Sequence, residues 1–211
     1  MGELILVRHG ETEWSRARRH TGRTDLPLTA RGEAQARALR GALAGRRIVR
    51  TLSSPAGRAR RTAELAGLKP DGLDSDLWEW DYGGYEGITT PAIQEDRPGW
   101  YLWDDGVIPG DAGHPGETVE QVGKRADAVI ARVRPLLADG AGGDGDGDGD
   151  GGDGGDVALV AHGHVLRVLT ARWLDLEPAR GRSFALETGT VSALGTEHGR
   201  PVITAWNVAA Q

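Results

Sequence analysis

Residues 6–15 read LVRHGETEWS and continue an apolar run that begins at Leu4 and Ile5. An uninterrupted apolar run is typical of a strand buried on both faces, as in a parallel sheet. His9 then lies just beyond the carboxyl end of this strand. In open α/β sheets, ligands bind at that edge because the loops that leave the strands converge there. A surface loop with solvated charges is the alternative, and these ten residues alone do not decide between the two.

A second apolar run has the same ending. VALVA, residues 157–161, leads directly into His162 and Gly163. Between the two runs, residues 48–52 predict a short strand. A helix follows it, with Ser54 as N-cap and Pro55 as first helical residue, and ends at Gly67. This order predicts a βαβ unit with a right-handed crossover. Because parallel strands end at the same edge of a sheet, we expect His9 and His162 to lie close together.

Capping residues and periodicity predict the remaining elements. Thr29 caps a helix that ends before Gly45, and apolar residues at helical spacing predict an amphipathic helix over 118–138. An apolar helix follows His164. A strand through Leu77 and Trp78 and two closing strands near 191–194 and 202–206 complete the sheet. The predicted fold class is α/β, a three-layer αβα sandwich with a mostly parallel central sheet.

The composition favours one domain. A chain of 211 residues with 38% hydrophobic residues can bury one core. There is no cysteine, which excludes disulfides, thiolate zinc sites and a cysteine nucleophile. The start, MGELILVRHG, has no basic leader, and its apolar run is too short for a signal sequence or a membrane span. We therefore expect a cytoplasmic protein without membrane contact.

Residues 139–156, DGAGGDGDGDGDGGDGGD, hold seven of the 31 acidic residues and none of the 25 basic ones. The rest of the chain is therefore almost neutral, although the formal net charge is −6. Such a tract buries too little apolar surface to become ordered, so we expect a disordered loop. Asp144, Asp146 and Asp148 match the start of a calcium loop, but Gly155 stands at its twelfth position, where a glutamate is required. We therefore favour a solvated loop over a calcium site.

Several cationic side chains are expected at the predicted sheet edge. Arg8 and His9 follow the first strand, and Arg58 lies in the first turns of the helix after residue 53. Helix N-termini favour anions, and arginine binds phosphate in a bidentate manner. Together with His162, these residues predict a compact phosphate pocket.

Six motifs in this order resemble the histidine phosphatase superfamily, which has the phosphoglycerate-mutase-like fold. They are LVRHGETEWS, TGRTDLPLTARGEAQA, SSPAGRARRTA, LWEWDYGGYEG, PGETVEQVGKR and LVAHGH. Within it, EWDYGGYEGITTPAI, GETVEQVGKR and AHGH are most similar to the branch of acid phosphatases and sugar bisphosphatases. We expect a single domain over 1–211. The stretch PAIQEDRPGWYLWDDGVIPGDAGHPGE, with its prolines, glycines and aromatic residues, predicts a lid-like insertion at about 88–118.

The resemblance also implies a mechanism, in which His9 is the nucleophile and forms a phosphohistidine. Arg8, Arg58 and His162 would hold the phosphate oxygens, and Glu79 would be the general acid, with an acidic to neutral pH optimum. The substrate is expected to be a small phosphorylated metabolite, with no cofactor and no metal. The implied substrate-binding residues are Ser15, His20, Thr21, Gly22, Tyr82 and Gly163.

Two alternatives to a hydrolase are a mutase and a non-catalytic binding module. Mutases of this family carry an arginine and a histidine directly after the acid, where this chain has Trp80 and Asp81, and Asp81 would repel a second anionic group. A non-catalytic phospho-ligand binding module is disfavoured because every matching position is filled. The neutral body predicts no nucleic-acid partner. An exposed sheet edge would allow a homodimer.

Four more residues are expected either near the site or in structural and surface positions. His164 and Arg125 are either substrate contacts or structural, and for Arg125 a salt bridge within the region of the amphipathic helix is favoured. His114 and His198 are expected at the surface.

Overall fold

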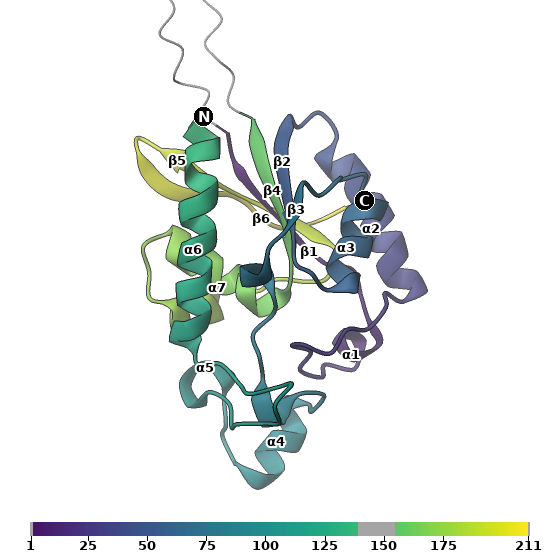
Figure 1. The fold of residues 1–211 in the computed structure, drawn as a ribbon, viewed down its shortest axis with the longest axis vertical. Helices are drawn as coiled ribbons and strands as arrows, with labels where there is room; N and C mark the ends of the chain where they lie inside the picture. Colours follow the sequence, from purple (N-terminus) through teal and green to yellow (C-terminus); the bar gives the residue numbers. More distant parts are fainter. Residues whose placement is uncertain (1, 139–154, 211) are drawn as a thin grey trace, which may run out of the picture.

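The structure is a computed structural model that describes residues 2–138 and 155–210. Within these residues a six-stranded sheet crosses the centre of the molecule in the order β3-β2-β4-β1-β5-β6 (Figure 1). Strands β1, β2, β3 and β4 pair in parallel, while β5 is antiparallel to β1 and to β6. The strands are β1 (Leu4–Arg8), β2 (Ile48–Ser53), β3 (Gly72–Leu73), β4 (Asp156–Ala161), β5 (Thr190–Glu197) and β6 (Arg200–Ala209).

Helices cover both faces of this sheet, which confirms the predicted three-layer α/β class (Figure 1). The long helices are α2 (Ala30–Leu43) and α3 (Gly57–Leu65) on one face and α6 (Val119–Ala138) and α7 (Gly163–Trp173) on the other. The shorter elements are α1 (Glu13–Arg16), α4 (Thr90–Asp96), α5 (Leu102–Asp105), η1 (Ser75–Leu77), η2 (Gly83–Tyr85) and η3 (Pro178–Ser183).

The alternation along β1 explains why the sheet has two cores. Leu4 and Leu6 pack with the apolar side of α6 and α7, and Ile5 and Val7 pack with α2 and α3. All four side chains are almost completely buried. Since successive side chains of a strand point to opposite faces, a continuous apolar run requires helices on both sides.

The predicted helix boundaries hold where a local cap sets them. The Thr29 side chain accepts from the Gly32 N–H at the start of α2, as predicted. The prediction that Ser54 is the N-cap of the next helix was wrong, because α3 begins only at Gly57. Its N-cap residue is Ala56, whose side chain cannot form a capping hydrogen bond. Instead, an Asp25 side-chain oxygen accepts from the Gly57 N–H at 2.7 Å. The helix N-terminus is thus capped from a distant loop.

The strand predicted through Leu77 and Trp78 was also wrong. The third parallel strand is the short β3, and η1 follows it. The Asp74 side chain accepts from the Asp76 N–H, which favours a turn at this point. Of the predicted loop over 139–156, residues 139–154 lie outside the described part of the chain, and Asp156 already belongs to β4.

Gly10 and Gly32 allow the loop after β1 to touch the first turn of α2. A Cβ atom on Gly10 would lie 2.2 Å from the Gly32 carbonyl oxygen, and one on Gly32 would lie 2.1 Å from that of Glu11. Any side chain at either position would therefore push the two backbones apart. This contact places the residues that follow β1 directly against α2.

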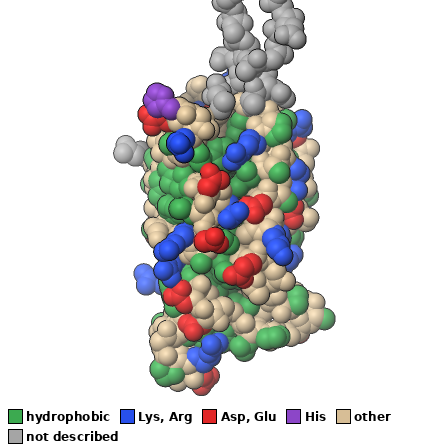
Figure 2. Space-filling view, turned by 90° about the vertical axis from the view of Figure 1, so that its left-hand side faces the viewer, with side chains coloured by type: hydrophobic (Ala, Val, Ile, Leu, Met, Phe, Trp, Pro, Cys, Tyr) green, Lys and Arg blue, Asp and Glu red, His purple; other side chains and the backbone are tan. Residues whose placement is uncertain are grey.

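The segment that carries α4 and α5 lies beyond the ends of β1 and β4 that lead to the histidines (Figure 1). Figure 2 shows another face, where basic and acidic side chains are interspersed rather than gathered by sign. Ion pairs among the described residues include Arg132 with Asp74 and Asp76, and Arg172 with Asp127. Among the residues described, no helix combines the length and the apolar character needed to cross a bilayer.

Candidate active site

The two strand-end histidines lie side by side, as predicted. Arg8 of β1 is in register with Ala161 of β4, so both strands deliver their histidines to one edge. The ring centroids of His9 and His162 are 5.1 Å apart. Both rings are buried, with exposures of 5% and 0%.

His9 is held with one ring nitrogen free. Its Nδ1 lies 2.7 Å from the Gly10 carbonyl oxygen. Because a carbonyl oxygen only accepts, Nδ1 carries the proton, and Nε2 of the neutral ring has a free lone pair. Burial, together with the positive charges of Arg58 and Arg8, lowers the pKa of His9 well below its ordinary value. The geometry and the charge environment therefore both favour an unprotonated Nε2.

Arg58 links the histidine pair to a neighbouring loop. Its Nε donates to Nδ1 of His162 at 3.1 Å, and its Nη atoms donate to the carbonyl oxygens of Gly22 and Thr24 at 2.8 Å each. Since Nδ1 of His162 accepts, Nε2 carries the proton and donates to Ser54 Oγ at 2.7 Å. Ser54, predicted as a helix cap, is therefore a partner of His162.

Arg8 has one buried donor without a partner. Its side chain donates to the Leu186 carbonyl oxygen, while its buried Nε has no hydrogen-bond partner within the described residues. A buried N–H without a partner is costly unless a ligand satisfies it. Gly163 leaves room for this guanidinium, because a Cβ atom there would lie 3.2 Å from Arg8 Cζ.

Glu79 lies at the first turn of α7. Its carboxyl oxygens accept from the backbone N–H groups of Trp80, His164 and Val165 at 2.8 to 2.9 Å. Arg125 holds the preceding segment, since it donates to the carbonyl oxygens of Asp76 and Trp78 and forms the expected salt bridge, with Glu117. Glu79 is therefore fixed in position although it lies in a loop.

A cavity of about 510 Å³ lies over these groups. Arg8, His9 and Glu79 line it, whereas the buried Arg58 and His162 do not. Of the predicted substrate contacts, Ser15, His20, Thr21 and Tyr82 line the cavity, and Gly22 and Gly163 do not. The Ser15 hydroxyl is already engaged, since it accepts from the Thr12 N–H and donates to the Thr12 carbonyl oxygen.

Several cavity residues were missed from the sequence, namely Arg18, Arg19, Arg167 and Glu187. Arg167 follows His164 by three residues in α7, and this helical spacing could have indicated a shared face. Arg18 has a φ of 56°, in the left-handed region, and this backbone conformation could not be predicted from the sequence. Tyr101 and Trp103 of the 88–118 segment also line the cavity, whereas Trp100 packs against His20 and Tyr85.

His164 belongs to the site. Its Nδ1 lies 2.6 Å from the Tyr82 hydroxyl, and its ring lines the cavity. Burial lowers the pKa of His164 well below its ordinary value and raises the pKa of Tyr82 well above its own. Both groups are therefore neutral at physiological pH. In the part of the chain that is described, no group of three or more metal-ligating side chains gathers here or elsewhere.

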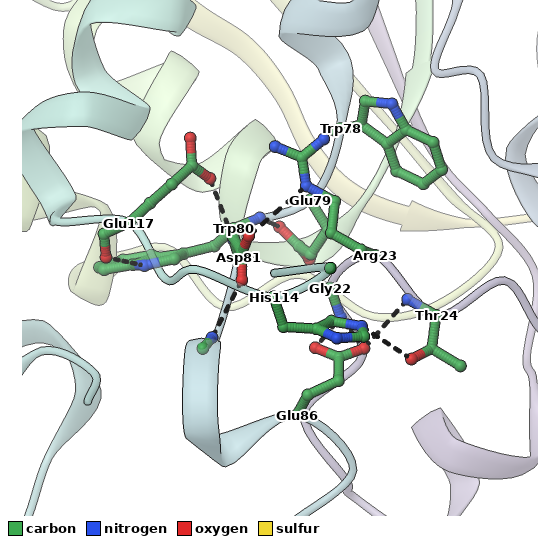
Figure 3. Close-up of polar contacts among 12 residues, drawn as sticks. Gly22, Arg23, Thr24, Trp78, Glu79, Trp80, Asp81, Glu86, His114 and Glu117 are labelled. Atoms are coloured by element: carbon green, nitrogen blue, oxygen red, sulfur yellow. Dashed lines mark hydrogen bonds and ion pairs between the residues drawn. The ribbon is translucent and has the colours of Figure 1, made fainter. Parts of the chain in front are cut away.

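Asp81 does not face the cavity, so the expected repulsion of a second anionic group was wrong. Its side chain is 1% exposed and lies 3.8 Å from Arg23 Nε (Figure 3). Its other oxygen accepts from the Gly83 N–H at 3.0 Å. Arg23 also lies over the Trp78 ring, which is parallel to the His162 ring at 6.4 Å. Asp81 thus belongs to the packing behind the site.

Comparison with known proteins identifies the family of this fold and site. The chain belongs to the histidine phosphatase superfamily (branch 1), whose family model matches residues 4–209. This agrees with the resemblance read from the sequence. The chain is accordingly an enzyme, and its reaction is the hydrolysis of phosphate monoesters.

Two curated relatives are phosphatases. An acid phosphatase of Mycobacterium tuberculosis is 39% identical over 199 residues, which cover 93% of this chain and 87% of the relative. A sedoheptulose 1,7-bisphosphatase of Saccharomyces cerevisiae is 36% identical, with 82% and 67% covered. A solved structure from Mycobacterium tuberculosis matches with a TM-score of 0.86 and 36% identity, over 100% of this chain and 99% of that one.

Proposed function

We propose that this enzyme hydrolyses small phosphorylated metabolites through a phosphohistidine on His9. The observation that carries the proposal is the free Nε2 of His9 beside the cavity. Attack by this nitrogen on phosphorus forms a P–N bond and breaks the P–O bond of the ester. The Nδ1–H group, which donates to the Gly10 carbonyl oxygen, stabilises the positive charge that the ring gains.

Glu79 supplies the proton in this proposal. In its protonated form it transfers a proton to the leaving oxygen as the P–O bond breaks. The resulting carboxylate then takes a proton from a water molecule that attacks the phosphohistidine. The P–N bond breaks, inorganic phosphate leaves, and both His9 and Glu79 return to their first states. Support comes from the three N–H groups that fix the carboxyl oxygens beside the cavity.

The cationic groups stabilise the phosphoryl oxygens during transfer. Arg8 lines the cavity with its positive charge, and the buried Arg58 adds positive potential behind it and holds His162 in place through its Nε–H group. Ser15, His20, Thr21 and Tyr82 line the space for the leaving group. Gly22 acts through its carbonyl oxygen, which accepts from Arg58, and Gly163 acts through the room that it leaves for Arg8. We place the enzyme in the cytoplasm, as a monomer or homodimer without a nucleic-acid or membrane partner.

The decisive experiment is trapping of the phosphoenzyme. The purified protein is mixed with a ³²P-labelled phosphomonoester in the presence of EDTA and quenched in alkali, because phosphohistidine is labile to acid. We expect label on the wild-type protein and none on His9→Ala, which circular dichroism shows to be folded. Wild-type turnover by His9→Ala would show the proposed mechanism to be wrong.

The same reaction mixture separates hydrolysis from the mutase reaction. A hydrolase releases inorganic phosphate in proportion to the ester consumed. A mutase, as the name of a 30% identical relative of Salmonella choleraesuis suggests for that protein, would return the phosphoryl group to the organic product. A substrate panel that includes phosphoglycerates and sugar bisphosphates therefore tests both activities.

A further inference from the structure

Glu86, which the proposed mechanism does not use, holds a short segment of backbone beside the site. Its carboxylate accepts from the Gly22 N–H at 2.9 and 3.0 Å and from the Thr24 N–H at 3.1 Å (Figure 3). Hydrogen bonds to an ionised acceptor are stronger than those between neutral groups. One side chain thus fixes the N–H groups of two residues in a loop without regular structure.

The carbonyl groups of the same two residues bind Arg58. The guanidinium donates to the oxygens of Gly22 and Thr24 at 2.8 Å each. A carboxylate and a guanidinium therefore hold residues 22–24 from two directions, one through N–H groups and the other through carbonyl oxygens. Such a chain of hydrogen bonds polarises each peptide group and strengthens the next bond.

Residues 22–24 have little room to move. A Cβ atom on Gly22 would lie 2.7 Å from the Trp80 carbonyl oxygen and 2.8 Å from Glu86 Oε2. Thr24 Oγ1 also lies 3.4 Å from Nε2 of His114. The fit between the segment and Glu86 is therefore close enough for a change at Glu86 to move the carbonyl groups that bind Arg58.

The chain of contacts continues to the centre of the site. Arg58 Nε donates to Nδ1 of His162, and this bond determines that the proton of His162 is on Nε2, toward Ser54. The His162 ring is 5.1 Å from that of His9. A shift of Arg58 would therefore break the hydrogen bond that fixes the tautomer of His162. It would also move the positive charge that lies beside the nucleophile His9.

We propose that Glu86 is a positioning residue of the phosphate pocket, which acts through residues 22–24 on Arg58 and through Arg58 on His162. The proposal rests on the proposed function, since it takes this pocket to be where the phosphoryl group binds. It assigns Glu86 no contact with substrate.

The backbone around Glu86 makes a substitution there tolerable. The Gly87 N–H donates to the His20 carbonyl oxygen at 2.8 Å, and the His20 N–H donates to that of Ile88 at 3.0 Å. These bonds join the two segments without the Glu86 side chain. We therefore expect Glu86→Ala and Glu86→Gln to fold, and thermal unfolding checks this.

The test measures the affinity for inorganic phosphate by calorimetry and the ring nitrogens of His162 by ¹⁵N NMR. For Glu86→Ala we expect about a tenfold loss of affinity, the effect of one hydrogen bond to a charged group, and for Glu86→Gln about threefold. We also expect the His162 nitrogens to shift toward a mixture of tautomers. Glu33→Gln is the matched control, since its carboxylate binds Arg61 of the same helix α3 but not residues 22–24.

Phosphate affinity equal to wild type in folded Glu86→Ala would overturn the proposal, as would a loss of affinity with unchanged His162 signals. If Glu86→Ala does not fold, the same two outcomes in Glu86→Gln decide. Neither measurement needs turnover. A failure of the phosphohistidine mechanism, detected with His9→Ala, is therefore distinct from a failure of this proposal.

Discussion

At the scale of single residues, the hydrogen bond from His9 Nδ1 to the Gly10 carbonyl oxygen matters most, because it chooses the nitrogen that can attack. The position of His9 was predictable from the end of an apolar run, and that of His162 from a second run of the same kind. Their tautomers were not, because these depend on the Gly10 carbonyl and on Arg58, whose placement only the folded chain determines.

The pH dependence of the rate follows from His9. Its pKa lies well below the ordinary value of 6.5, so the neutral, nucleophilic ring persists in acid. We expect the acidic limb of the kcat/KM profile, which reports protonation of His9, to have its midpoint below 6.5. A profile measured with one phosphomonoester checks this, and a fall in rate centred at 6.5 or above would contradict it.

Glu79→Gln tests proton donation to the leaving group. An alkyl phosphate needs a proton on its leaving oxygen, whereas p-nitrophenolate leaves without one. We expect kcat for an alkyl phosphate to fall by about 100-fold or more, in the range of general acid catalysis, and kcat for p-nitrophenyl phosphate to fall far less. Equal losses on both esters would argue against Glu79 as the acid.

At the scale of elements, most helices and strands were predictable because their signals are local. Thr29 and Gly45 mark the two ends of α2, and the periodic apolar residues of α6 are buried along its length. The N-terminus of α3 was not predictable from local signals, because its cap, Asp25, lies in a separate loop. The short strand β3 was missed because two residues leave no periodic pattern.

The contact between the β1 loop and α2 predicts opposite effects for two glycines of one helix. In Gly32→Ala the new methyl group meets the Glu11 carbonyl oxygen, so we expect a loss of about 1–3 kcal/mol in the free energy of unfolding. The control is Gly41→Ala, where nothing lies within 4 Å, and we expect a gain of about 0.5–1 kcal/mol. Urea denaturation measures both, and equal effects would contradict the role given to Gly32.

At the scale of the whole molecule, the stability depends on buried neutral histidines. Burial lowers the pKa of His9, His162 and His164 well below 6.5, while the unfolded chain keeps ordinary values. As the pH falls through and below 6.5, the unfolded state binds more protons than the folded state. Stability is therefore fully present above about 6.5 and lost toward acid, by up to about 1.4 kcal/mol per pH unit for each such histidine.

Denaturant unfolding at a series of pH values, without phosphate, measures this slope. We expect His164→Gln to reduce the slope because one of the three histidines is removed. A free energy of unfolding that stays constant from neutral pH to one unit below 6.5 would show that these rings take up protons in the folded state.

The placement of β1 has a consequence for how activity is acquired. Both neighbours of β1, β4 and β5, come from the last third of the chain, and Leu4 pairs with Val157 across 153 residues. Closing so long a loop is slow and brings little gain until the sheet forms around it. During synthesis β1 cannot pair with either neighbour until β4 has been made, and in refolding the return of turnover requires this long-range pairing.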